Sequence, residues 1–257
     1  MSSTLYSSDR GSGPSTLVLL HGFGASHAVW NDVVAEFSRT TRTIAYDLPG
    51  HGGSLAFPDA GPPKLAARAI AADLAERGID RAHVVGHSMG GAIAVLIGLM
   101  APDRIASLTL LAPGGFGPEI NGPLLRRYGA AVEASEIRGC LAAMSGPQAT
   151  VSDTSLGAYR QMRVQHGQAD KLGEIAALIT KGERQGEIPR EMLATLAMPV
   201  SVLWGDADPV LPVSQAQGLP ASFKVRILPG AGHMLIGETP AEVAALIHAQ
   251  LAGRSTH

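Results

Sequence analysis

Six short apolar runs constrain the fold of this chain more than any other feature, because each is long enough for a strand and too short for an ordinary helix. Segments with a helical period lie between some of them, at about Leu65–Arg77, Met89–Ala101 and Glu238–Leu251. Apolar strands that alternate with helices are typical of a mostly parallel sheet with helices on both faces. We therefore predict an α/β fold. The runs are Thr16–His21, Thr43–Leu48, Ala82–His87, Ile105–Ala112, Val200–Trp204 and Lys224–Leu228.

The alternation of strands and helices stops between Pro113 and Pro199. Residues rich in glycine and proline open this stretch, and its interior has an amphipathic, helical pattern. An excursion of this length within an α/β unit is usually a functional insertion. We therefore expect a core formed by residues 1–112 and 200–257. Residues 113–199 are expected to form a helical cap over the carboxyl ends of the strands, where such sheets bind ligands.

Composition and charge exclude several classes of protein. The formal net charge of -2 provides no basic surface for nucleic acid. Cys140 is the single cysteine and the histidines show no ligand spacing, so neither a metal site nor any cofactor is expected. No secretory signal and no membrane-spanning segment is apparent, which predicts a cytoplasmic protein without a membrane partner. The expected partner is a small-molecule substrate, and a homo-oligomer is left open.

The segment Gly86-His87-Ser88-Met89-Gly90 fits the pattern G-x-S-x-G between an apolar run and a helical segment of small residues. At such a motif the chain turns sharply from strand to helix and exposes the serine above the end of the sheet. Glycines at positions 86, 90 and 91 permit the close passage of strand and helix. Ser88 is therefore predicted to be a nucleophile. The alternative is an ordinary helix N-cap serine.

Two backbone amides are predicted to form an oxyanion site. One belongs to Met89, directly after the nucleophile, and the other to Phe23, which follows a His-Gly pair at the end of the first apolar run. The ring of Phe23 is expected to line the acyl pocket. His21 precedes the nucleophile in the chain, so we expect it to brace the loop rather than act as the base. His51 and His87 are also expected to have structural roles.

A general base and a carboxylate partner follow Ser88 in the chain. His233 comes after the last apolar run, and Asp206 and Asp208 come after the run before it, so both loops reach the same edge of a parallel sheet. The histidine would take the serine proton while a buried carboxylate holds the imidazole in the correct tautomer. Only one of the two aspartates can accept from the imidazole, and either remains a candidate at this point.

Four blocks of residues together resemble the α/β-hydrolase superfamily: HGFG at 21–24, DLPGHGGS at 47–54, GHSMGG at 86–91, and WGDADPVLP with GAGHM at 204–212 and 231–234. The resemblance covers almost the whole chain from Leu17 onward. It implies a triad of Ser88, Asp208 and His233, because the family places the acid three residues after the glycine of the fourth block. About sixteen residues precede the first clear strand, so the leading antiparallel strands of the family are expected to be short or absent.

A closer likeness is to the hydrolase-like catalytic domain of the dihydrolipoamide acyltransferase components of acetoin dehydrogenase complexes. It rests on the segments LPGHGGS, VGHSMGGAIA, APGGFGPEING and PVSVLWGDADPVLP. Members of that group carry an N-terminal lipoyl domain, for which this sequence has no segment. A free-standing relative is therefore expected.

The predicted function is hydrolysis of a carboxylic ester through an acyl-serine intermediate. Acyl transfer uses the same intermediate and is the first alternative. A carbon–carbon bond or enol-lactone hydrolase is the second, although such enzymes often have an aromatic residue where Met234 follows His233. Four arginines of the cap, at positions 126, 127, 160 and 163, are expected to form solvated ion pairs with Glu133, Glu136 and Asp170. The expected substrate-binding residues are Phe23, Leu141, Met144, Tyr159 and Met162, with Tyr128 and Leu178 as further candidates.

Overall fold

The computed structural model of the chain describes residues 5–253 and confirms the predicted α/β fold. Its sheet has seven strands in the order β1-β3-β2-β4-β5-β6-β7. Every neighbouring pair is parallel except β1 and β3. The strands are Ser7–Arg10 (β1), Thr16–Leu20 (β2), Arg42–Tyr46 (β3), Ala82–His87 (β4), Ile105–Leu111 (β5), Val200–Gly205 (β6) and Phe223–Leu228 (β7).

All six strands predicted from the apolar runs are present, with ends that differ by at most two residues from the runs. The additional strand, β1, has four residues and pairs antiparallel with β3. This agrees with the expectation that leading strands are short or absent. The last strand, β7, lies at an edge of the sheet, and its four central residues are exposed.

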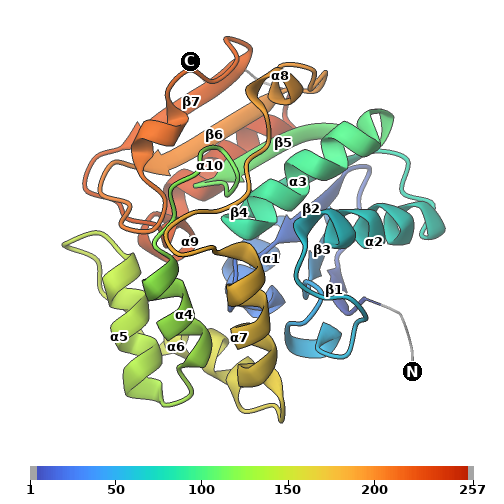
Figure 1. Cartoon of the computed structure of the whole chain (residues 1–257). Coiled ribbons are helices and arrows are strands. Elements are labelled where there is room, and N and C mark those ends of the chain that lie inside the picture. The colour runs from blue at the N-terminus through green and yellow to red at the C-terminus, as the bar shows by residue number, and fades with distance from the viewer. Residues whose placement is uncertain (1–4, 254–257) are drawn as a thin grey trace.

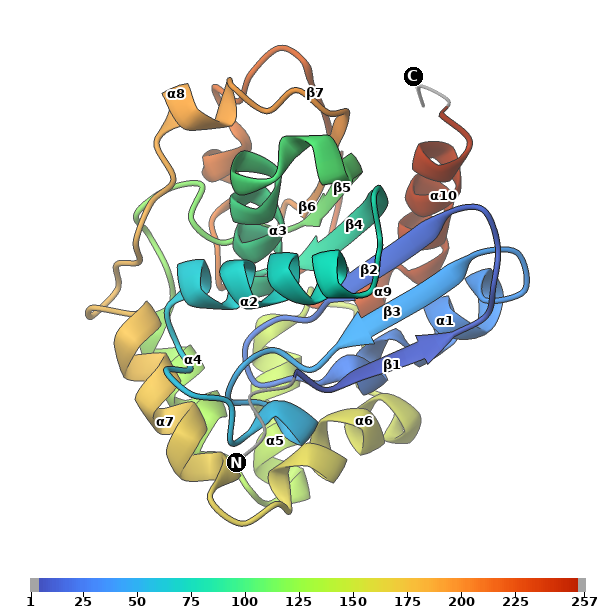
Figure 2. The ribbon, with the colours of Figure 1, turned by 90° about the vertical axis from the view of Figure 1, so that its right-hand side faces the viewer.

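Helices cover both faces of the sheet (Figure 2). The helices α2 (Pro63–Glu76) and α3 (Met89–Met100) pack together on one face, and α1 (Asn31–Phe37) and α10 (Pro240–Leu251) lie on the other. The short helix α9 (Leu235–Glu238), which the sequence did not predict, precedes α10. None of the helices within the described part of the chain is both long enough and apolar enough to cross a bilayer.

Five helices lie between β5 and β6, and all except the last, α8, gather below the sheet in Figure 1. Within this group α4 packs against α5 and α7, and α6 packs against α5 and α7. The position of the group matches the helical stretch predicted between Pro113 and Pro199. The helices are Gly122–Ala130 (α4), Ala134–Met144 (α5), Asp153–Arg163 (α6), Gln168–Ile179 (α7) and Arg190–Leu193 (α8).

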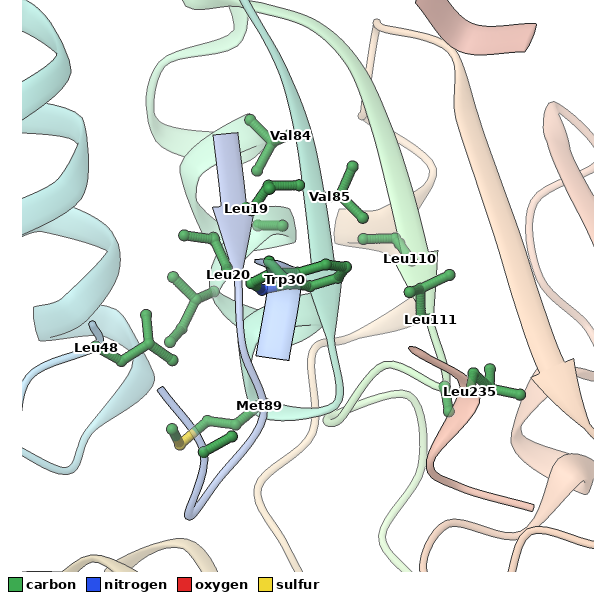
Figure 3. Close-up of a cluster of buried hydrophobic side chains, with 14 of the residues drawn as sticks. Leu19, Leu20, Trp30, Leu48, Val84, Val85, Met89, Leu110, Leu111 and Leu235 are labelled. Atoms are coloured by element: carbon green, nitrogen blue, oxygen red, sulfur yellow. The ribbon is translucent and has the colours of Figure 1, made fainter. Parts of the chain in front are cut away.

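The core is built from the apolar strands in the middle of the sheet. Figure 3 shows side chains of β2, β4 and β5 in one cluster with Trp30 and Leu235. Four successive residues of β2, Leu17 to Leu20, have no exposed surface, as expected for a strand covered on both faces. This packing fixes the ends of β4, β6 and β7, from which the polar loops described below extend.

Candidate active site

Ser88 lies at the turn between β4 and α3 in a conformation that is rare for a residue with a side chain, with φ 52° and ψ -117°. The turn is possible because strand and helix pass without side chains between them. A Cβ at Gly86 would lie 2.3 Å from the carbonyl oxygen of Gly90, and one at Gly90 would lie 2.3 Å from that of Leu20. The predicted strand–turn–helix geometry of the motif is therefore present, and strain of this kind is concentrated at functional sites.

A chain of hydrogen bonds joins Ser88 to His233 and Asp208. The Nε2 atom of His233 lies 3.0 Å from Ser88 Oγ, and its Nδ1 atom lies 2.8 Å from Asp208 Oδ2. His233 is in the loop between β7 and α9, and Asp208 is in the loop after β6. Both are at least nine-tenths buried. The arrangement allows the imidazole to take a proton from Ser88 while the carboxylate holds the ring.

Asp208 and Asp206 have different surroundings. The second oxygen of Asp208 accepts hydrogen bonds of 2.8 Å from the amides of Val210 and Leu211, so both carboxylate oxygens are fixed. Asp206 is exposed and accepts from the amide of Gly230 at 2.7 Å. Asp206 thus ties together the loops after β6 and β7, and the structure brings Asp208, not Asp206, to His233.

Glu238 holds the loop of His233, which the sequence did not predict. Its Oε2 atom accepts from the amides of Gly146 and Gly232, and its Oε1 atom accepts from Met234, each at 2.8 Å. The carboxylate therefore joins both sides of His233 to the chain that follows α5. No sequence signal could have revealed this role, because an acidic residue next to the start of a helix is ordinary.

The backbone of His233 is fixed by two further hydrogen bonds. Its amide donates to the carbonyl of Met144 at 2.8 Å, and its own carbonyl accepts from Nε2 of His87 at 2.8 Å. Burial, reinforced by His233, lowers the pKa of His87 to about 3, so its ring is neutral and carries a proton on Nε2. His87 thus has the structural role that was expected of it.

Phe23 and Met89 are the residues whose amides the sequence predicted for an oxyanion site. Both residues line the same cavity as Ser88. Within residues 5–253 neither amide donates a hydrogen bond to another group of the protein. Met89 is also the first residue of α3, where the orientation of the peptide dipoles favours negative charge. Two amides in this position can stabilise an oxygen that becomes negative.

His21 and His51 brace the loop of Phe23. The ring of His21 donates from Nδ1 to the carbonyl of Gly22 at 2.7 Å and accepts from the amide of Leu48 at 3.0 Å. The ring of His51 accepts from the amide of Gly24 at 3.1 Å. Burial lowers the pKa of His21 to about 4, and burial together with the charge of His21 lowers that of His51 to about 3. These contacts agree with the bracing role expected of His21 and with a structural role for His51, although the sequence did not predict that His51 would contact the loop of Phe23.

These neutral histidines predict that the protein loses stability in mild acid. A histidine of the unfolded chain titrates near pH 6.5, whereas His51 stays neutral in the folded protein until about pH 3. Between these values the unfolded state binds more protons, so the free energy of unfolding falls as the pH falls. At pH 5 the loss is about 2 kcal/mol for each such histidine.

The substitution His51→Gln tests this dependence, because glutamine keeps one acceptor and one donor but does not titrate. Urea unfolding should show that the loss of stability between pH 7 and pH 5 is smaller in His51→Gln by about 2 kcal/mol. His166→Gln, at an exposed position, is the control and should leave the pH dependence unchanged. An equal loss in wild type and His51→Gln would contradict the assignment.

A cavity of about 350 Å³ opens beside Ser88. Apart from Ser88, its polar side chains are Lys64, Gln185 and Glu187, and the other side chains are apolar. The amide group of Gln185 is bound to the backbone of Gly115 and Gly117, so it is not free for a ligand. The apolar lining consists of Phe23, Pro62, Pro63, Met89, Ala92, Leu96, Ile120, Leu125, Leu178, Ile179, Ile188 and Leu211.

A second hollow of only about 10 Å³ lies on the side of Ser88 that faces His233. Met144, Tyr159 and Tyr128 line it, together with Phe23 and Met234.

The structure places the expected substrate-binding residues in different surroundings. Phe23 borders both spaces beside Ser88, and Leu178 borders the larger one. Met144 and Tyr159 border only the smaller one. Leu141 instead lines a separate hollow toward Glu238, and Met162 is buried without bordering either space beside Ser88. The described residues contain no group of histidine, cysteine or acidic side chains suited to hold a metal ion.

Residues 17–246 match the Alpha/beta hydrolase family, and the chain belongs to this family. The closer likeness inferred from the sequence is also confirmed. The chain is 34% identical, over 233 residues, to the dihydrolipoyllysine-residue acetyltransferase component of the acetoin cleaving system of Pseudomonas putida. The match covers 91% of this chain but only 62% of that relative, so the chain spans about three-fifths of the relative's length.

Solved structures with the same fold include two hydrolases. A meta-cleavage product hydrolase of Pseudomonas fluorescens IP01 has a TM-score of 0.83 at 20% identity, with 97% of this chain and 94% of that chain covered. The carboxylesterase CesB of Bacillus subtilis has a TM-score of 0.76 at 21% identity, with 98% and 88% covered. At these identities the similarity establishes the shared fold.

Proposed function

We propose that this protein hydrolyses a carboxylic ester through an acyl-Ser88 intermediate. The observation that carries the proposal is the continuous chain of hydrogen bonds from Ser88 Oγ through His233 to Asp208. We assign the amides of Phe23 and Met89 as the donors that stabilise the oxyanion. Serine is a weak nucleophile unless a base adjoins it, and here the base is within hydrogen-bond distance.

In the first half of the reaction, Ser88 Oγ attacks the ester carbonyl carbon and His233 Nε2 takes the serine proton. The carbonyl oxygen becomes negative and accepts hydrogen bonds from Phe23 and Met89. Asp208 stabilises the imidazolium without taking its proton. When the carbon–oxygen bond to the alcohol breaks, His233 gives the proton to the leaving alkoxide, and the acyl group stays on Ser88.

In the second half, water replaces the alcohol. The hollow beside His233, of about 10 Å³, has room for about one water molecule. His233 takes a proton from this water as its oxygen attacks the acyl carbon, and the proton then returns to Ser88 as the acid leaves.

The acyl group fits the large apolar cavity, and the alcohol must then lie on the side of His233. Side chains from α3, α4 and α7 all border this cavity. We therefore assign residues 113–199 the role of a cap that covers a core of residues 1–112 and 200–257. The preferred substrates are esters in which an apolar acyl chain is joined to a small alcohol.

Two isomeric esters test this division of the site. Methyl hexanoate places its carbons in the acyl group, whereas pentyl acetate places them in the alcohol. Because each buried methylene contributes about 0.8 kcal/mol, kcat/KM is expected to be at least about tenfold higher for methyl hexanoate. Leu96→Trp, which fills the cavity, should reduce this preference. Leu99→Trp, on the same helix but outside the cavity lining, should not. A preference for pentyl acetate would reverse the assignment of the two spaces.

Acyl transfer to a thiol is the second candidate, because the chain resembles an acetyltransferase component over 91% of its length. The two functions share the acyl-Ser88 intermediate and differ in the acceptor. Supplying methyl hexanoate with increasing dihydrolipoamide, and quantifying hexanoic acid and hexanoyl thioester, separates them. We expect the acid to dominate at millimolar thiol. If the thioester dominates while total turnover rises, the protein is a transferase. The same assay with Ser88→Ala measures how much thioester forms by direct attack of the thiol on the ester.

A further inference from the structure

Gly24 is one point at which the helices inserted between β5 and β6 contact the loop of Phe23. It has φ +71°, and a Cβ there would lie 2.5 Å from Cε1 of Tyr128 and 2.8 Å from Nη2 of Arg163. Tyr128 belongs to α4 and Arg163 to α6. Only glycine therefore permits this approach, and Gly24, the residue after Phe23, lies directly against two polar side chains of the cap.

Both side chains donate hydrogen bonds to the carbonyl of Gly24. The hydroxyl of Tyr128 lies 2.9 Å from this oxygen, and Nη2 of Arg163 lies 3.3 Å from it. Burial raises the pKa of Tyr128 to about 12, so the hydroxyl keeps its proton at neutral pH. The amide of the same glycine donates to His51. The backbone of Gly24 is thus held from the core on one side and from the cap on the other.

Arg163 has surroundings that differ from those expected from the sequence. It is only 2% exposed, and its Nη1 donates to the carbonyls of Tyr128, Gly129 and Ala131 at 2.7, 3.1 and 2.8 Å. Its guanidinium lies 4.5 Å from the ring centroid of Tyr128. Among the residues that the structure describes, no carboxylate is within ion-pair distance of it. The expectation of a solvated ion pair is therefore wrong for Arg163.

The physical reason is that Arg163 faces the carboxyl end of α4, where the last carbonyls carry partial negative charge. These carbonyls take the place of a carboxylate. Burying a cation without a carboxylate is nevertheless costly, and the Nε atom of Arg163 has no hydrogen-bond partner. The packing of the helices alone does not require this arrangement, since an apolar side chain would also fill this volume.

We infer that Tyr128 and Arg163 are positioning residues for the proposed oxyanion site, and that they act by fixing Gly24, the residue after Phe23, through its carbonyl. The inference rests on the proposed function. Stabilisation of an oxyanion depends on donors that are already in place before the charge develops. The loop contains Gly22 and Gly24, which permit backbone movement, and His21 and His51 hold it only from the side of the core. The cap thus completes the catalytic machinery in addition to covering the substrate.

The substitution Tyr128→Phe removes one donor and keeps the ring that packs against Phe23. Loss of a direct oxyanion donor costs about 10² to 10³ in kcat, so a displaced donor is expected to cost less, about tenfold, with KM nearly unchanged. Arg163→Lys is a second variant and should show the same pattern. Tyr46→Phe is the matched control, because it removes a buried hydroxyl whose partner, Asp73, belongs to α2 outside the site.

Binding of two ketones separates positioning from a general structural role. Ser88 adds to a hexyl trifluoromethyl ketone to form a hemiketal, its proton passes to His233, and the former carbonyl oxygen becomes an oxyanion. Hexyl methyl ketone binds without forming this adduct. In Tyr128→Phe the ratio of the two affinities should fall by about the same tenfold factor as kcat. If Tyr128 had only a structural role, the variant would bind both ketones more weakly by the same factor, and the ratio of affinities would be unchanged.

The outcomes distinguish this inference from the proposed function. If the wild-type protein neither hydrolyses methyl hexanoate nor forms the hemiketal, the proposed function fails and the inference fails with it. If the wild type does both, and folded Tyr128→Phe keeps the wild-type kcat and affinity ratio, the inference alone is overturned. A lowered kcat and ratio in Tyr128→Phe, with wild-type values in Tyr46→Phe, supports it.

Discussion

Replacing Ser88 with alanine is expected to lower kcat by at least about 10³-fold, leaving only the contributions of binding and of the oxyanion site. The substitution removes one oxygen and keeps the Cβ, so the strained backbone at φ 52° is no more strained than before. The fold and the melting temperature should therefore be unchanged. Ester hydrolysis with methyl hexanoate, followed alongside thermal unfolding, checks both statements.

A folded Ser88→Ala protein that retains the wild-type rate would eliminate an acyl-Ser88 intermediate. A merely structural serine at the N-cap would give that result, with a loss of stability in place of a loss of rate. The side chain of Ser88 makes no capping hydrogen bond to α3, so we expect the substitution to lower kcat and to leave the stability unchanged.

Replacing Asp208 with asparagine is expected to lower kcat by about 10⁴-fold, as in the serine protease for which the corresponding substitution is a known example. The amide presents an N–H group where the imidazole must donate, which favours the wrong tautomer. Val210 and Leu211 amides also donate to this side chain, so a rotated amide could not satisfy both neighbours and His233.

Asp206→Asn is the matched control, since it makes the same chemical change two residues away. Its side chain is exposed and contacts Gly230, not His233. We expect kcat to fall by less than about threefold, because the loss of one surface hydrogen bond disturbs the loop only slightly. If Asp206→Asn were the more damaging of the two, the acid that orients His233 would have to be Asp206.

The sheet could be predicted because each strand is encoded locally. Runs such as Thr16–His21 are apolar over their whole length, and a fully covered parallel strand requires that pattern. Ser88, Asp208 and His233 could also be predicted from the sequence. The G-x-S-x-G motif and the loops of the other two residues all follow strands that end at one edge of the sheet.

The contacts that hold these residues could not be predicted, because they join segments far apart in the chain. Glu238 reaches Gly146, and Arg163 reaches Gly24, through packing that no local pattern encodes. The residues that line the spaces beside Ser88 were difficult to predict for a related reason. Amphipathic helices show which face is buried, yet Leu141 and Met162 are buried away from the spaces beside Ser88.

Locating a covalent adduct tests the central claim most directly. The protein would be treated with a fluorophosphonate that bears a hexyl chain, digested, and analysed by mass spectrometry. We predict one phosphonyl group on the peptide that contains Ser88, none in Ser88→Ala, and a loss of esterase activity in proportion to labelling. Full esterase activity in protein that carries the phosphonyl group on Ser88, or complete inactivation by labelling at another residue, would contradict the account.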